Sequence, residues 1–173
     1  MKKLALAAAL LAFSTPAIAE NPADLNDLEI AHVAYIADNI DIRYAHLALA
    51  MSSDPEVKKF AQTMIRDHEA VNAAALELLA KLGAQAQDNF LSKQLNANAE
   101  TIIDDLAARR GEDFDKAYAA NELAYHKAVN NLVEHTFIPN IDHPEVKALF
   151  ETGLEIFKAH EGHAEMMVKA LND

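Results

Sequence analysis

Apolar residues recur every three or four positions through most of the chain, which is the spacing of one face of an α-helix. No segment shows the sustained two-residue alternation of a half-buried β-strand. The sequence therefore predicts an all-α protein. The spacing is unbroken in segment 55–82, where it links Val57, Phe60, Met64, His68, Val71, Ala75, Leu78 and Leu82.

The same period predicts four further helices, near residues 24–52, 89–109, 112–136 and 144–171. Asp54 fits the N-cap of the helix that begins at Pro55, and Gly83 fits its end. Long helices with short connections are typical of antiparallel bundles. We expect a ferritin-like antiparallel four-helix bundle with one additional short helix, the one over 89–109.

The first 19 residues have the pattern of a secretory signal peptide. A short basic start, Met1-Lys2-Lys3, precedes an apolar run that is too short to span a bilayer. Ala17-Ile18-Ala19 then forms a small-x-small cleavage site. We expect export by the general route, cleavage after Ala19, and a single periplasmic domain over residues 20–173.

The composition argues against several classes of binding partner and of catalysis. The formal net charge is −12, and it becomes −14 once the two lysines of residues 1–19 are removed, which argues against binding to nucleic acid or to anionic lipid. The absence of cysteine excludes thiol catalysis, thiolate zinc sites, iron–sulfur clusters and disulfides. We expect no membrane span, and the sequence does not indicate a protein partner or an oligomeric state.

Histidines at the centres of the helices are the strongest functional signal. His68, His126 and His160 each lie on or beside the apolar face of a different helix, near its middle. In an antiparallel bundle such positions share a layer. Asp41 and Glu122 can join them, and Glu122 precedes His126 by four residues, one helical turn. These five residues predict a buried metal site.

Each candidate also has a simpler interpretation. A lone histidine on an apolar face is more often a hydrogen-bonded core residue than a ligand. Asp38 has the position of a solvated charge at the flank of its helix, whereas Asp67 can either be exposed or orient an imidazole. Methionines one turn from histidines hint at copper, but methionine is usually core filler. Glu29-x-x-His32 occurs only once, so the standard di-iron pattern is absent.

Several segments resemble a family of bacterial cell-envelope proteins catalogued as domain-of-unknown-function family four-one-four-two, whose members are often labelled outer membrane proteins. The resemblance rests on the segment from Asp54 to Asn72, which holds Asp67-His68, and on Phe114-Asp115-x-x-Tyr118, His126 and His160. The chain departs from the family pattern in two places. Asp41 stands where the family usually has Glu, and Leu154-Glu155 stands where it has Leu-Pro.

The resemblance implies a ferritin-like bundle in the cell envelope and no established activity. We expect a transition metal ion held by the core histidines, for which Zn, Cu, Ni and Fe are all suitable. One alternative is a redox or oxygen-handling enzyme, which needs a redox metal with an open coordination position. The other is a non-enzymatic envelope stress or interaction protein without metal, whose histidines point apart and bond to backbone or hydroxyl groups.

Overall fold

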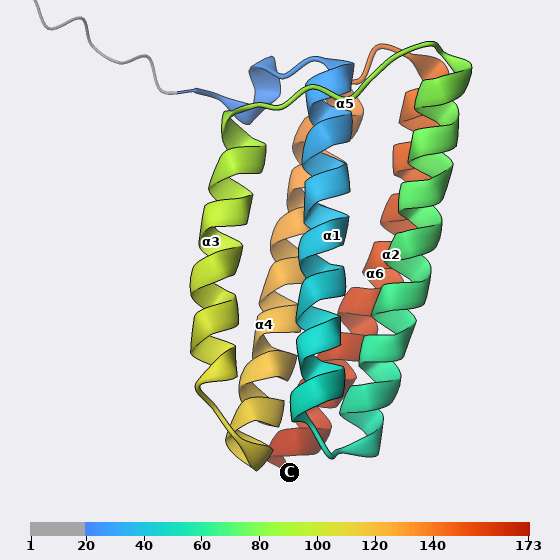
Figure 1. The fold of residues 1–173 in the computed structure, drawn as a ribbon. Helices are drawn as coiled ribbons and strands as arrows, with labels where there is room; N and C mark the ends of the chain where they lie inside the picture. Colours follow the sequence, from blue (N-terminus) through green and yellow to red (C-terminus); the bar gives the residue numbers. More distant parts are fainter. Residues whose placement is uncertain (1–19) are drawn as a thin grey trace, which may run out of the picture.

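The computed structural model describes residues 20–173, and these residues form helices and connecting loops (Figure 1). The predicted all-α bundle is confirmed, whereas its ferritin-like character stays a prediction. The predicted signal peptide lies outside the described residues. The long helices are α1 (Asp27–Met51), α2 (Pro55–Lys81), α3 (Phe90–Ala107), α4 (Gly111–Leu132) and α6 (Pro144–Asn172); the short ones are η1 (Pro22–Asp24), η2 (Val133–Phe137) and α5 (Ile138–Asn140).

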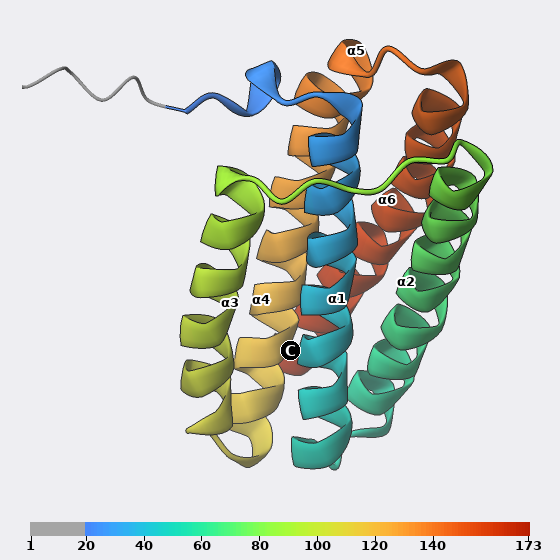
Figure 2. The same ribbon diagram turned by 45° about the horizontal axis from the view of Figure 1, so that its top comes forward.

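Four of the long helices surround the core, and α3 is attached at one side. Helix α1 packs against α2 and α4, and α6 packs against the same two helices from behind. Helix α3 contacts α1 and α4, as Figure 2 shows from a second direction. The loop of residues 82–89 crosses the end of the bundle to reach α3, and Gln87 N donates to Leu28 O at 3.0 Å.

Local signals set the helix ends. Asp54 caps α2, because its Oδ1 accepts from the backbone N–H groups of Glu56 and Val57 at 2.8 and 3.1 Å. Gly83 follows α2 with a φ of +62°, a left-handed conformation that glycine adopts at little cost. Both roles were predicted from the sequence.

The helix predicted over 112–136 ends earlier than expected. Helix α4 ends at Leu132, and the π-helical turn η2 follows it directly. At the end of this turn, Ile138 N donates to Val133 O. Pro139 has no N–H to continue the α-helical pattern, and its ring crowds the preceding turn. The wider π turn therefore accommodates the proline, and α5 follows it directly.

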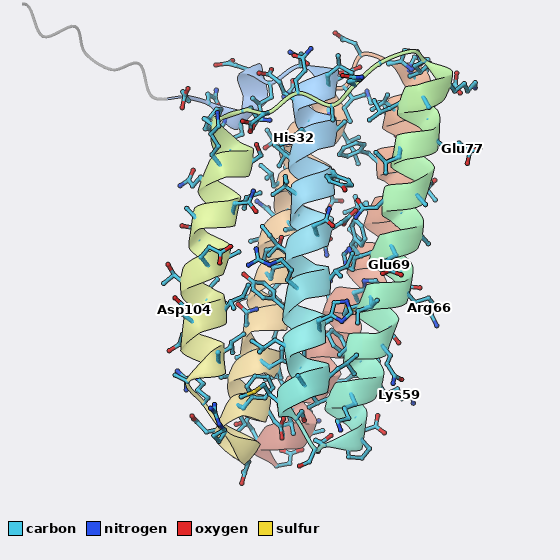
Figure 3. All side chains as sticks on the ribbon, in the orientation of Figure 1. His32, Lys59, Arg66, Glu69, Glu77 and Asp104 are labelled. Carbon is cyan, nitrogen blue, oxygen red and sulfur yellow. The ribbon has the colours of Figure 1, made fainter. Side chains whose placement is uncertain are left out.

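The faces of α2 show how the sequence pattern becomes packing. Lys59, Arg66 and Glu77 point away from the bundle in Figure 3. Phe60 and Met64 lie on the opposite side and are fully buried. Within the described residues, no helix is long and apolar enough to cross a membrane.

Candidate metal centre

Side chains from four helices meet in the interior at mid-height of the bundle. Asp41 comes from α1, His68 from α2, Glu122 and His126 from α4, and His160 from α6. All five are buried, and Asp41 and Glu122 have no exposed surface. The structure thus brings together all five residues that the sequence singled out for this layer.

Two overlapping groups of these residues could hold an ion. In one, single ring nitrogens of His68, His126 and His160 all lie within 4.8 Å of one another. In the other, atoms of Asp41, Glu122 and His126 satisfy the same limit. His126 belongs to both groups: its Nε2 lies 3.4 Å from Asp41 Oδ2, and its Nδ1 lies 3.8 Å from Glu122 Oε2.

The spacing around Asp41 is that of ligands on a common ion. Its Oδ2 lies 3.4 Å from Nε2 of His68 and 3.4 Å from Nε2 of His126. Normal N–H···O hydrogen bonds are shorter, at about 2.7–3.2 Å. Two atoms that each lie about 2.1 Å from a tetrahedral zinc ion are about 3.4 Å apart. The observed distances therefore fit coordination better than direct hydrogen bonding.

One ring nitrogen of each imidazole is hydrogen-bonded to a protein oxygen. Nδ1 of His68 donates to Asp38 Oδ1 at 2.7 Å, and Nδ1 of His126 donates to the backbone oxygen of Glu122 at 2.9 Å. Nε2 of His160 donates to Asp67 Oδ2 at 3.0 Å. Partners of this kind orient the ring and raise its basicity in metal sites.

Asp67 is itself held in place from outside the bundle. Arg66 binds both of its carboxylate oxygens, at 2.7 and 3.0 Å. This hydrogen bonding by Arg66, opposed by partial burial and assisted by His160, lowers the pKa of Asp67. A carboxylate that stays ionised is a strong acceptor, so it fixes the His160 ring with Nδ1 free.

The remaining polar atoms of the five side chains have no hydrogen-bond partner. They are both oxygens of Asp41, both oxygens of Glu122, Nε2 of His68, Nε2 of His126 and Nδ1 of His160. An unsatisfied buried polar group costs about 1–3 kcal/mol. Seven such atoms would cost on the order of 10 kcal/mol, which equals the whole stability of a typical domain. A bound cation would satisfy most of them at once.

Charges in the metal-free cluster are strongly perturbed. Burial lowers the pKa of His68, but Asp41 and Asp38 together outweigh burial and raise it to about 10. Burial raises the pKa of Glu122 well above its ordinary value, and the neighbouring Asp41 charge adds to the effect. Without a metal, His68 is thus an imidazolium at pH 7, and Glu122 keeps its proton to a higher pH than an ordinary carboxyl group does.

The pKa values of the other two imidazoles are lowered, in contrast to that of His68. Burial lowers the pKa of His160 to about 4, against the raising effect of Asp67, and the nearby His68 and His126 lower it further. Burial also lowers the pKa of His126, although Asp41 opposes it. Both rings are neutral at pH 7, which is the form that binds metals.

Asp38 does not occupy the position that the sequence suggested. Its side chain is 4% exposed and bonded to His68, not a solvated charge at the flank of α1. Asp38 and Asp41 are three residues apart and share a helix face, a signal that could have paired them. Asp67 does orient an imidazole, but that of His160 rather than that of its neighbour His68.

Other chemistry-bearing residues lie elsewhere. His46 and His135 are exposed, and His32 is near Asp88 at 4.0 Å. Met64 and Met167 belong to the apolar core cluster, which favours a packing role over copper ligation. Tyr118 is fully buried with an unpartnered hydroxyl, one turn before Glu122 on α4.

Comparison with known proteins identifies the family. No curated protein and no solved structure matches the chain with significance. The family model described as "Domain of unknown function (DUF4142)" matches residues 12–167, which include all five residues of the cluster. Because the match covers most of the chain, the protein belongs to the DUF4142 family.

Proposed function

We propose that this protein binds one transition metal ion at the centre of its bundle. The ligands are His68 through Nε2, His126 through Nε2 and His160 through Nδ1, with Asp41 and Glu122 as carboxylate ligands. The observation that carries the proposal is the position of Asp41 Oδ2, 3.4 Å from two imidazole nitrogens that have no other partner. Imidazole and carboxylate without thiolate suit Zn, Cu, Ni and Fe.

We further propose that the protein works in the periplasm, within the cell envelope. The support is the signal-like pattern of residues 1–19 and the acidic composition, which keeps a protein away from anionic lipid surfaces. An ion held between four helices would tie them together and stabilise the folded state by mass action.

Calorimetric titration with zinc and nickel salts tests the site. The wild-type protein is expected to bind one ion per chain, and the double variant His68→Ala/His160→Ala to bind none. The matched control is His46→Ala/His135→Ala, which removes two exposed histidines and should bind like the wild type. Circular dichroism of each variant verifies that the helices are retained.

Two results would overturn the proposal. One is uptake by the His68→Ala/His160→Ala variant with wild-type stoichiometry. The other is a wild-type protein that neither binds nor is stabilised by zinc, copper, nickel or iron salts. In the second case the histidines are core residues, and a metal-free interaction protein becomes the leading interpretation.

A further inference from the structure

A fully buried tyrosine stands next to the metal centre, and the proposed ligand set does not use it. Tyr118 lies on α4, one helical turn before Glu122, and has no exposed surface. Residues four positions apart share a face of a helix. His126 continues this face by one further turn and is buried as well. The phenol, the carboxyl group and the imidazole therefore form one row along the inner face of α4.

Apolar neighbours hold the Tyr118 ring. Phe114, one turn earlier on α4, stacks on it with ring centroids 6.1 Å apart and an interplanar angle of 5°. Phe60 of α2 meets it edge-on, with centroids 6.2 Å apart and an angle of 76°. Both phenylalanines are fully buried. Packing thus sets the position of the ring, but it offers the hydroxyl no polar partner.

The Tyr118 hydroxyl and the Glu122 carboxyl group are both unpaired in the metal-free protein. The hydroxyl oxygen and both carboxyl oxygens are buried and have no hydrogen-bond partner of ordinary geometry. Burial raises the pKa of Tyr118, and the charges of Glu122 and Asp41, together with contact between the hydroxyl and Glu122, raise it further. The hydroxyl is therefore a protonated donor that lies close to the acidic side of the cluster.

A carboxylate that binds a metal ion through one oxygen keeps a second oxygen that can accept a hydrogen bond. Ligating carboxylates are usually held by such a bond from a neighbouring donor. We infer that Tyr118 is a positioning residue of the metal centre, whose hydroxyl donates to the Glu122 oxygen that does not bind the ion. The inference rests on the proposed metal site. Tyr118 acts through Glu122 and does not touch the ion itself.

Zinc titration of the variant Tyr118→Phe tests the inference. The substitution keeps the ring and its packing and removes only the hydroxyl. Zinc affinity should fall about 10- to 100-fold, because Glu122 loses the partner that orients it. The matched control is Tyr125→Phe, which removes a hydroxyl of the same helix that donates to Ala37 O at 2.9 Å. The control should bind zinc like the wild type.

A double-mutant cycle with Glu122→Ala separates positioning from a general structural effect. If Tyr118 acts through Glu122, adding Tyr118→Phe to the Glu122→Ala variant should change zinc affinity less than about twofold. An independent effect on the fold would lower the affinity by the same factor in both backgrounds. Urea unfolding of metal-free Tyr118→Phe should show no loss of stability, because the substitution removes an unpaired buried hydroxyl.

Three results would overturn the inference, and they differ in what else they overturn. Wild-type zinc affinity in Tyr118→Phe would remove the positioning role and leave the metal site intact. Equal losses in the wild-type and Glu122→Ala backgrounds would show that the hydroxyl does not act through Glu122. A wild-type protein that takes up no zinc would overturn the proposed function and this inference together.

Discussion

Metal binding to this cluster should release protons, and the structure predicts how many. In the metal-free protein at pH 7, His68 is charged because its pKa is about 10, and it must lose this proton to become a ligand. Burial raises the pKa of Glu122, so Glu122 releases a second proton wherever the pH lies below that raised pKa. Asp41, whose pKa is lowered by the histidines despite burial, and the neutral His126 and His160 contribute none. One proton should leave His68 for each ion bound, and a second should leave Glu122 at pH values below its raised pKa.

The size of the pH effect follows from the same values. Deprotonating His68 at pH 7, three units below its pKa of about 10, costs about 4 kcal/mol of the binding free energy. Each released proton makes the apparent affinity rise about tenfold per pH unit. The His68 proton alone should make zinc affinity rise about tenfold between pH 6 and 7 and again between pH 7 and 8, and the rise should be steeper below the raised pKa of Glu122.

Calorimetry in buffers of different ionisation enthalpy measures the proton count directly. The variant Glu122→Gln mimics the neutral acid and cannot ionise, so it should release about one proton, from His68, whatever the pH between 6 and 8. A zinc affinity that is independent of pH, with no proton release, would contradict this prediction, because the ion would then bind elsewhere or His68 would be neutral before binding.

Three further predictions concern the surroundings of the cluster. Asp67→Ala should weaken zinc binding about 10- to 100-fold, because His160 loses the partner that orients it, while Glu69→Ala, exposed on the same helix, should leave calorimetric affinity unchanged. Asp54→Ala should lower the free energy of unfolding by about 0.5–2 kcal/mol in urea titrations, because α2 loses its N-cap; an unchanged midpoint would contradict this. Metal-free protein should lose stability as the pH falls from 6.5 towards 4, because the unfolded chain protonates His160 at a higher pH than the folded chain does. In His160→Gln this part of the pH dependence, measured by denaturation at several pH values, should be absent.

Helix periodicity made the bundle and its central histidines predictable. His68 stands in an unbroken apolar pattern on α2, and a polar group there must find a partner in the interior. Mid-helix placement of His126 and His160 then put three imidazoles in one layer, because the helices have similar lengths. Each of these predictions depended only on the apolar pattern within a single helix.

The partners of the histidines depended on packing between helices. Asp38 lies off the apolar face of α1, and its burial arises from contact with His68 across the α1–α2 interface. Asp67 and His68 are neighbours on α2, but their side chains point in different directions. Asp67 binds His160 of α6, not His68. The π turn η2 was missed because the apolar pattern continues through it, although Pro139 marks its end.

The central claim is that one ion lies between the helices, and anomalous diffraction from crystals grown with zinc tests it most directly. We predict a single anomalous peak inside the bundle, about 2.0–2.2 Å from His68 Nε2, His126 Nε2 and His160 Nδ1, with Asp41 or Glu122 completing the coordination. An interior without a peak, in which water molecules or protons satisfy the same five side chains, would contradict the claim.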